Sequence, residues 1–270
     1  MTSVLRPHEW RWQAGGGYYT ARPEDLAHRP RLPDFEKRRD LQTAGLFDAF
    51  LPRDRTPEVL ELGCGASAWL PHLARRGCRV TGLDYEPAAV ELTMANMRGA
   101  DAPGEILCRD AFATADNVDL IDRFDMVYSR GLFEHFADVV ARLRSVRPYL
   151  RPDGVIFTMV PNLQGINWAL QRFGDLRVLE THVIYDVDLL RRRHEEAGFV
   201  TLLATYLGFY DGFVSATAPG IPRWRSIAHR AMCRGSNLVA HHFARLVHGG
   251  PLPEWPWLSP CVVYVGRRGD

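Results

Sequence analysis

A glycine-containing loop that follows an acidic residue is the first feature of this sequence that could do chemistry. Residues 59–67 have the sequence Val-Leu-Glu-Leu-Gly-Cys-Gly-Ala-Ser, in which a short apolar run leads to Gly63 and Gly65. The absence of a Cβ at both glycines permits a tight turn and a close approach of the backbone to a ligand. A helix beginning near Ser67 would direct its N-terminal amides at that ligand. The segment therefore predicts a nucleotide-type binding site.

Acidic residues on either side of this loop extend the predicted site. Glu61 lies two residues before Gly63, where its carboxylate can accept hydrogen bonds from a cationic ligand. Asp84 ends the next expected strand, at a position where an acid can accept hydrogen bonds from both ribose hydroxyls of a nucleotide. With Ala68 in the third place, the spacing also fits a dinucleotide fingerprint. A nicotinamide-dependent oxidoreductase is therefore an open alternative at this point.

Glu134 and His135 follow the fourth expected strand and are the leading acid–base candidates. A histidine titrates near neutral pH, so it suits the removal of a proton from a substrate. Open α/β sheets bind ligands beyond the carboxyl ends of their strands. We therefore expect both side chains at the mouth of the site.

Strand and helix patterns alternate along the middle of the chain, which predicts an α/β fold with a parallel sheet. Pro87 falls in a first helical turn, and Gly198 follows a helix as a C-terminal stop. The expected strands are 58–62, 79–83, 105–108, 124–128 and 154–160, and the expected helices are 67–76, 86–98, 138–149 and 186–197.

A series of segments occurs in the order that is typical of one family. They are Glu61–Gly65, Val80–Asp84, Cys108–Ala111, Phe124–Ser129, Phe133–Phe136 and Leu150–Phe157. Together they resemble the class I S-adenosylmethionine-dependent methyltransferases. The resemblance covers residues 56–161 well and 182–207 loosely. It implies a Rossmann-like, seven-stranded, mostly parallel sheet with an antiparallel edge hairpin, for which the alternating segments 201–206 and 261–267 are the candidates.

The resemblance also suggests how the chain is divided. Residues 1–55 would form an N-terminal lid with a helix over 35–50, and residues 56–270 would form the methyltransferase domain. Two insertions rich in aromatic residues, 161–185 and 208–258, would form a cap over the carboxyl ends of the strands. A helix is expected within the second insertion, over 224–247.

S-adenosylmethionine is the cofactor that the resemblance implies, with S-adenosylhomocysteine as its product. Aromatic faces attract a sulfonium ion, and Tyr18, Tyr19 and Trp168 are candidates for that contact. The residues implied to bind the cofactor are Tyr18, Tyr19, Glu61, Gly63, Cys64, Gly65, Asp84, Tyr85, Asp110, Ala111 and Ser129.

Glu134, His135, His182 and Tyr19 are the catalytic candidates. Methyl transfer from a sulfonium is an in-line displacement, so the protein must align the nucleophile and exclude water. A histidine recurs near the position of His182 in related small-molecule methyltransferases, which makes it a second candidate base. In the family, the Glu-His pair often only orients the loop and the cofactor by hydrogen bonding, so that role stays open for Glu134 and His135.

A magnesium site is the next question that the resemblance raises. The quinone O-methyltransferases use an additional acid just upstream of the Glu-His pair to help hold magnesium, and Gly131 occupies that position here. Because hard cations need several oxygen ligands, the loss of this carboxylate predicts methyl transfer without a metal.

The overall composition narrows the class of partner. The chain has 270 residues and a formal net charge of +1, so no broad basic field for nucleic acid is expected. Its five cysteines are scattered without a CxxC pair, which favours reduced thiols in a cytoplasmic protein. No signal-peptide run occurs in residues 1–12, and no stretch approaches the ~18 apolar residues of a membrane span. A monomer or homodimer without membrane contact is expected.

The aromatic cap favours an apolar or aromatic small molecule as the methyl acceptor, in the biosynthesis of a specialised metabolite. Methylation of an indole-type carbon and O-methylation of a quinone-like molecule are two versions of this hypothesis. The oxidoreductase alternative lacks support from a Tyr-x-x-x-Lys pair, since Lys37 is the only lysine. A non-catalytic protein that keeps the fold is the third alternative.

Overall fold

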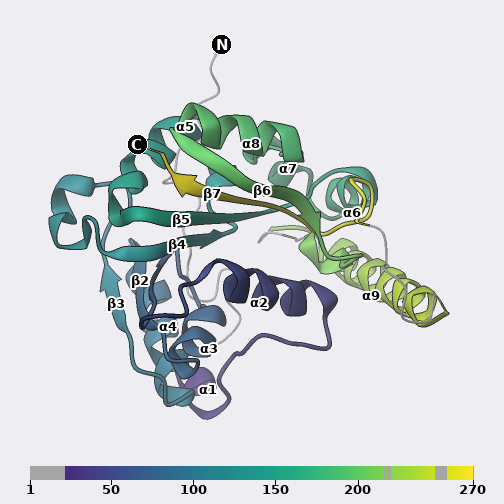
Figure 1. Ribbon diagram of the computed structural model, residues 1–270. Helices are drawn as coiled ribbons and strands as arrows, with labels where there is room; N and C mark the ends of the chain where they lie inside the picture. Colours follow the sequence, from purple (N-terminus) through teal and green to yellow (C-terminus); the bar gives the residue numbers. More distant parts are fainter. Residues whose placement is uncertain (1–21, 216, 218–219, 247–253, 270) are drawn as a thin grey trace.

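A seven-stranded mixed sheet forms the centre of the molecule (Figure 1). The computed structural model describes residues 22–215, 217, 220–246 and 254–269. The strand order is β3-β2-β1-β4-β5-β7-β6. The strands are β1 (Glu58–Leu62), β2 (Arg79–Asp84), β3 (Glu105–Cys108), β4 (Phe124–Arg130), β5 (Leu150–Pro161), β6 (Phe199–Leu207) and β7 (Cys261–Arg268).

The first five strands are parallel, and β7 runs antiparallel to both β5 and β6. This arrangement is the Rossmann-like sheet with an edge hairpin that the family resemblance implies. The central strands are buried on both faces, as expected when helices cover both sides of a parallel sheet. In β4, every residue from Phe124 to Ser129 is buried. The sheet order reverses between β1 and β4, so the carboxyl ends of these strands border the crevice where such sheets bind ligands.

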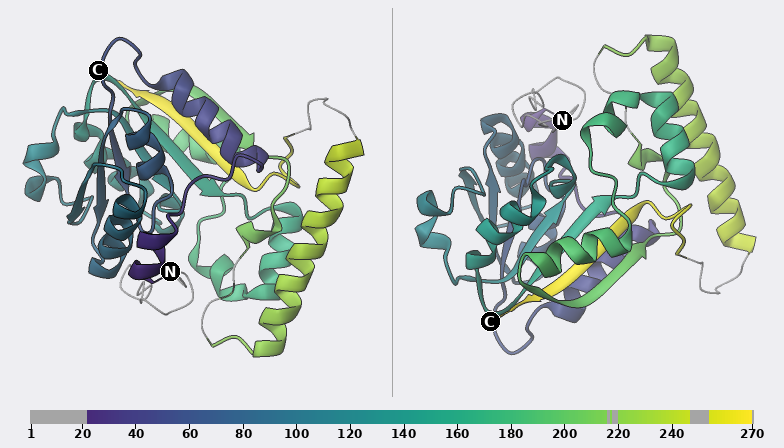
Figure 2. Two further views of the ribbon diagram at one scale, coloured as in Figure 1. Left: turned by 90° about the horizontal axis from the view of Figure 1, so that it is seen from below. Right: turned by 90° about the horizontal axis from the view of Figure 1, so that it is seen from above.

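Helices cover the two faces of the sheet and create two hydrophobic layers (Figures 1 and 2). On one face, α5 (Val139–Val146) and α8 (Val187–Glu196) pack against the strands. On the other face lie α2 (Arg38–Phe50), α3 (Trp69–Arg75) and α4 (Pro87–Gly99). The helix patterns in the sequence therefore reflect the amphipathic faces that bury against this sheet.

Helix α2 is an integral part of the core, although it precedes the segment that resembles the family most closely. Phe47 is 1% exposed, and its ring lies 5.2 Å from Trp69, 5.1 Å from Tyr128 and 5.2 Å from Phe157, measured between centroids. Ahead of it, α1 (Pro23–His28) packs on α4 through Leu26. Tyr18 and Tyr19, which the sequence assigns to the lid, lie outside the described residues.

The two insertions form a helical cap beside the carboxyl ends of the strands. The first contains α6 (Gly165–Gly174) and α7 (Leu176–Thr181), which the sequence patterns did not predict. The second contains a short 3₁₀ turn, η6 (Gly212–Val214), and α9 (Arg223–Leu246), close to the expected helix at 224–247. Both views of Figure 2 show α9 as the outermost element of this cap. None of the described helices has the length and apolar content needed to cross a bilayer.

Candidate active site

The loop after β1 has the conformation that its glycines predict. Gly63 and Gly65 have φ angles of +63° and +48°, in the left-handed region that glycine adopts without strain. A Cβ at Gly63 would lie 3.1 Å from the Leu132 side chain. The amide of Cys64 donates to the carbonyl of Leu83 at 3.1 Å, which ties the loop to β2. The loop is thus held open toward the carboxyl edge of the sheet.

Asp84 shapes this loop directly. Its two carboxylate oxygens accept hydrogen bonds from the amides of Gly65 and Glu86, each at 3.0 Å. The side chain is buried, and burial raises its pKa. Each carboxylate oxygen can accept more than one hydrogen bond. Asp84 therefore retains acceptor capacity for a ligand while it fixes the shape of the glycine loop.

Glu61 lies beneath the same loop and is linked to the start of α3. Its carboxylate accepts a hydrogen bond of 2.5 Å from the hydroxyl of Ser67, and that hydroxyl accepts from the amides of Trp69 and Leu70. Burial raises the pKa of Glu61 to about 8, although Ser67 and the positive charge of Arg130 oppose the shift. A cationic ligand would stabilise the ionised form of this carboxyl.

The other predicted cofactor residues differ in their exposure and in their hydrogen bonds. Ser129 is 1% exposed, and its hydroxyl has no hydrogen-bond partner among the described residues. Tyr85 is 51% exposed, whereas the side chain of Cys64, a residue of the loop itself, is buried in the core. Asp110 accepts from the amide of Phe112 at 2.9 Å, and Ala111 is buried behind it.

Three of the acid–base candidates lie close together in the structure: Glu134, His135 and His182. Glu134 and His135 belong to a 3₁₀ turn, η4 (Phe133–His135), after β4, whereas His182 follows α7. The ring centroids of His135 and His182 are 4.4 Å apart. The amide of Val183 donates to the Glu134 carbonyl at 2.7 Å and joins the two segments.

Burial changes the protonation of all three groups. It raises the pKa of Glu134 to about 8, and the Oε2 atom of Glu134 has no hydrogen-bond partner among the described residues. It lowers the pKa of His135 to about 3, with a contribution from His182, and that of His182 to about 4. At pH 7 both imidazoles are therefore neutral. Of the three, the pKa of Glu134 lies closest to the working pH of a general base.

One ligand atom from each of these residues lies within 4.8 Å of the other two, so the cluster could hold a metal ion. Two imidazole nitrogens and one carboxylate suit a borderline ion such as zinc. They suit magnesium poorly, because magnesium prefers oxygen ligands in octahedral geometry. Gly131 has a φ of +69° and supplies no further carboxylate. The donor set therefore does not fit the magnesium site of the quinone branch.

The cluster borders a cavity of about 340 Å³ between the sheet and the cap. Its walls combine apolar side chains with a few polar groups. Its lining residues come from α2, β4, η4, β5, α6, α7, η6, β7 and the loops between them: Arg39, Arg130, Gly131, Glu134, His135, Met159, Val160, Pro161, Leu163, Gln171, Val178, His182, Phe213, Val214 and Cys261. Both cap insertions thus contribute to the wall.

Sequence reasoning did not assign a role to two residues that line this cavity, Arg39 and Arg130, or to Tyr185, which interacts with Glu134. Arg39 donates to Asp211 at 3.0 Å, which joins α2 to the cap. The two residues lie far apart in the sequence, so no local pattern indicated this contact. Arg130 directly follows the buried part of β4. Tyr185 is 1% exposed; burial and then the charge of Glu134 raise its pKa, and its hydroxyl has no partner among the described residues. Trp168, in contrast, lies on α6 under the guanidinium of Arg172 and does not line the cavity.

Comparisons with known proteins agree with this geometry. A family model described as a methyltransferase domain matches residues 35–204. A ubiquinone biosynthesis O-methyltransferase from Methylobacterium sp. (strain 4-46) is 31% identical over 122 residues, which is 45% of this chain and 47% of that protein. A protein of the same name from Bradyrhizobium diazoefficiens is 30% identical over 143 residues, 53% of this chain and 52% of that protein. The chain spans about half the length of these curated relatives.

Solved structures share the fold at low identity. The phosphoethanolamine N-methyltransferase 2 of Haemonchus contortus, in complex with S-adenosyl-L-methionine, aligns with a TM-score of 0.54 at 13% identity, over 85% of this chain and 53% of that chain. A structure concerned with the conversion of a disulfide bond into a thioacetal group during echinomycin biosynthesis aligns with a TM-score of 0.55 at 18% identity, over 92% and 89%. The family match decides against the nicotinamide-dependent alternative. The chain belongs to the methyltransferase-domain family, and its fold is that of the class I S-adenosylmethionine-dependent methyltransferases.

Proposed function

We propose that this enzyme methylates an apolar or aromatic small molecule that binds in the 340 Å³ cavity beside Glu134, His135 and His182. The observation that carries the proposal is the convergence of these three side chains, from two distant segments, on a cavity with a mainly apolar wall. When bound, S-adenosylmethionine supplies a methyl group on a sulfonium. Gly63, Gly65 and Asp84 are the residues that we propose to hold it.

Glu134 is the group that we propose to take the proton of the acceptor. Its pKa of about 8 makes its carboxylate basic enough to accept a proton near neutral pH, whereas the imidazolium forms of His135 and His182 are too acidic to form readily. The two neutral imidazoles would instead orient the acceptor by hydrogen bonding. His135, the first-ranked base of the sequence analysis, thus becomes a positioning residue in this proposal.

Arg130 adds a second element of acceptor recognition. Arg39 forms salt bridges with Asp40 and Asp211, whereas Arg130 forms none among the described residues. A guanidinium at the cavity that forms no salt bridge favours an acceptor that carries or develops negative charge, such as a phenol. A neutral indole methylated at carbon would lack this interaction.

The test is methyl transfer from isotopically labelled S-adenosylmethionine to a panel of phenols, catechols, quinols and indoles. The proposal predicts turnover of at least one aromatic acceptor and a much slower rate in Glu134→Gln, with binding of S-adenosylhomocysteine retained. Turnover confined to phosphate-rich or polymeric acceptors would contradict the proposal.

O-methylation of a quinone-like molecule is the second candidate, because the curated relatives are named for ubiquinone biosynthesis. We propose that this chain, unlike the quinone branch, needs no magnesium, since Gly131 replaces the additional acid. Activity on quinols but not on other aromatic compounds would favour this candidate over a specialised metabolite. All five cysteines are unpaired, which supports a proposed cytoplasmic location. The proposed assembly is a monomer or homodimer.

A further inference from the structure

Helix α9 has an unusual division of side chains around its axis. It is 24 residues long and contains no aspartate or glutamate. One side packs against the cap: His229 and Cys233 are buried, and the Ser215 hydroxyl lies 2.8 Å from the Nε2 atom of His229. This attachment fixes which side of the helix faces outward.

The outward side of α9 is apolar and remains exposed. Spacings of three, four and seven residues place its large apolar side chains on one broad face. The six most prominent are Trp224 (66% exposed), Ile227 (50%), Leu238 (60%), Val239 (70%), Phe243 (50%) and Leu246 (78%). A helix in a soluble domain normally buries such a face, so its exposure indicates a binding surface.

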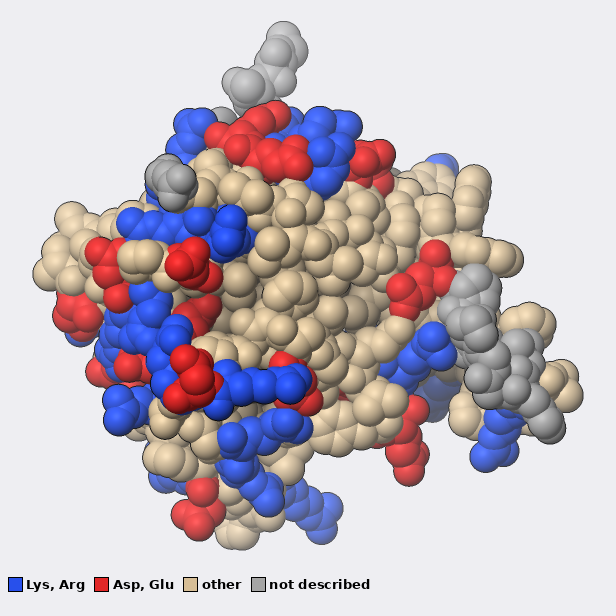
Figure 3. Space-filling model, in the orientation of Figure 1, with Lys and Arg blue, Asp and Glu red and all other residues tan. Residues whose placement is uncertain are grey.

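Arginines border this apolar face along one edge. Arg223, Arg230, Arg234 and Arg245 are separated by seven, four and eleven residues, so they share one side of the helix. All four are exposed, and Arg223, Arg230 and Arg234 form no salt bridge among the described residues. On the left of the molecule as drawn in Figure 3, by contrast, acidic and basic side chains are interspersed. The unbalanced positive charge of α9 therefore calls for an anionic partner.

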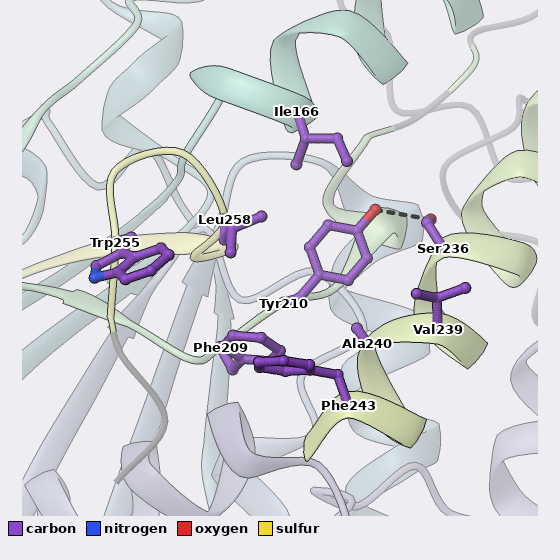
Figure 4. Close-up of a pocket in the computed structure, with 9 residues that line it drawn as sticks. All are labelled: Ile166, Phe209, Tyr210, Ser236, Val239, Ala240, Phe243, Trp255 and Leu258. Atoms are coloured by element: carbon purple, nitrogen blue, oxygen red, sulfur yellow. Dashed lines mark hydrogen bonds between the residues drawn. The ribbon is translucent and has the colours of Figure 1, made fainter. Parts of the chain in front are cut away.

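An apolar cavity of about 580 Å³ opens beside this face (Figure 4). Phe243 and Val239 of α9 line it together with Phe209, Ile166 and Trp255. Within the lining, the Tyr210 hydroxyl donates to the Ser236 hydroxyl at 2.7 Å. Trp255 and Trp257 are 53% and 70% exposed beside it. Such a cavity suits a hydrocarbon chain.

We propose that α9 and the adjoining residues 254–258 bind the surface of an anionic lipid membrane, with the helix lying in the interface. An exposed apolar face, a border of arginines and peripheral tryptophans are the properties of helices that bind in this way. The cavity would accommodate one acyl chain. This inference does not depend on the proposed acceptor, and it replaces the expectation of a protein without membrane contact.

Docking through α9 would bring the methyl-acceptor cavity close to the bilayer. Cys233 of α9 contacts Ser215 at 3.5 Å, directly after η6, and Phe213 and Val214 of η6 line the acceptor cavity. An acceptor dissolved in the membrane would thus have a short path to the site.

Co-sedimentation with vesicles tests the proposal. Full-length protein should bind vesicles that contain phosphatidylglycerol more tightly than vesicles of phosphatidylcholine alone, and added salt should weaken the binding. Because each arginine near an anionic surface contributes about fivefold to affinity, Arg230→Gln/Arg234→Gln should bind more than tenfold more weakly. Leu238→Ser/Val239→Ser should lose binding to both vesicle types. Circular dichroism and S-adenosylhomocysteine binding of these variants should match the wild type, which would show that they fold.

Arg191→Gln/Arg193→Gln provides the matched control, because it removes two partly exposed arginines from α8 that are paired with Glu195 and Glu196. This variant should bind as the wild type does. Absence of binding to anionic vesicles, or an equal loss in the control, would overturn the proposal. A dimer seen by light scattering that depends on Leu238 and Val239, without vesicle binding, would instead assign the face to a second copy of the chain.

Discussion

Replacing Asp84 by asparagine should weaken binding of S-adenosylhomocysteine strongly while leaving the fold intact. The Asp84 carboxylate accepts the amides of Gly65 and Glu86, each at 3.0 Å. An asparagine amide has one acceptor oxygen and one NH₂ group, which can only donate. In either orientation, the NH₂ group of the asparagine therefore faces one of the two backbone N–H groups, so that two donors meet. This contact distorts the loop that we propose to hold the adenosyl group.

The size of the effect follows from these contacts. A hydrogen bond to a charged group contributes about 1.5–3 kcal/mol, and every 1.4 kcal/mol corresponds to about tenfold in affinity. Loss of one such bond between the Asp84 carboxylate and a ribose hydroxyl, the contact that we propose, should therefore raise the Kd about 10- to 150-fold. The apo protein should not be destabilised to the same extent, because burial already raises the pKa of Asp84 and the change removes a poorly solvated charge.

Isothermal titration with S-adenosylhomocysteine measures the effect, and Asp48→Asn is its control. Asp48 lies near the amino-terminal ends of the strands, where it accepts from Arg76 at 2.6 Å. Loss of this half-exposed ion pair should change the Kd less than about twofold, since such pairs contribute little and lie far from the loop. A wild-type Kd for Asp84→Asn, or an equal loss in Asp48→Asn, would refute the reasoning.

Further outcomes concern the acceptor site and the backbone. The kcat/KM of the wild type should rise with pH toward the pKa of about 8 of Glu134, and Glu134→Gln should remove that limb; a limb that persists would contradict Glu134 as the base. Because the folded pKa is raised from 4.5, ionisation of Glu134 lowers the free energy of unfolding as pH increases from 4.5 through 8, and Glu134→Gln should flatten that decline in denaturant titrations. EDTA should leave the rate unchanged, and loss of activity restored by magnesium would contradict metal-free transfer. Gly165→Ala should destabilise by about 1–3 kcal/mol, since its φ is +55° and a Cβ would lie 2.5 Å from the backbone of Trp257. Gly45→Ala, whose Cβ would meet nothing within 4 Å in α2, should instead stabilise by about 0.5–1 kcal/mol, and the reverse order would count against both geometries.

Local patterns were sufficient to predict the sheet and the helices that flank it. The run before Gly63 became β1 with its expected bounds, 58–62, because a short apolar run between turn signals has few other ways to be buried. The expected helix at 224–247 likewise became α9, Arg223–Leu246. Helices α6 and α7 were not predicted. They occupy a segment with few charged residues, and their packing depends on α9 and on residues 255–259, far away in the chain.

The site was only partly predictable for the same reason. Glu134 and His135 are neighbours in the sequence, but their proximity to His182 depends on how the chain returns after α7. Arg39 reaches the cavity from α2 and binds Asp211, 172 positions further along the chain. The sequence also favoured His135 as the base, because histidine is basic near neutral pH in water. In the folded protein, burial lowers the pKa of both histidines and raises the pKa of Glu134. Glu134 is therefore the group of the three that can accept a proton near neutral pH.

A crystal structure with bound S-adenosylhomocysteine tests the central claim most directly, namely that the glycine loop and the Glu134 cluster belong to one site. The account predicts the ribose at Asp84, the adenosyl group along the Gly63–Gly65 loop, and the sulfur facing the cavity that contains Glu134, His135 and His182. A ligand whose sulfur faces away from this cavity, or whose ribose is bound elsewhere than at Asp84, would contradict the account.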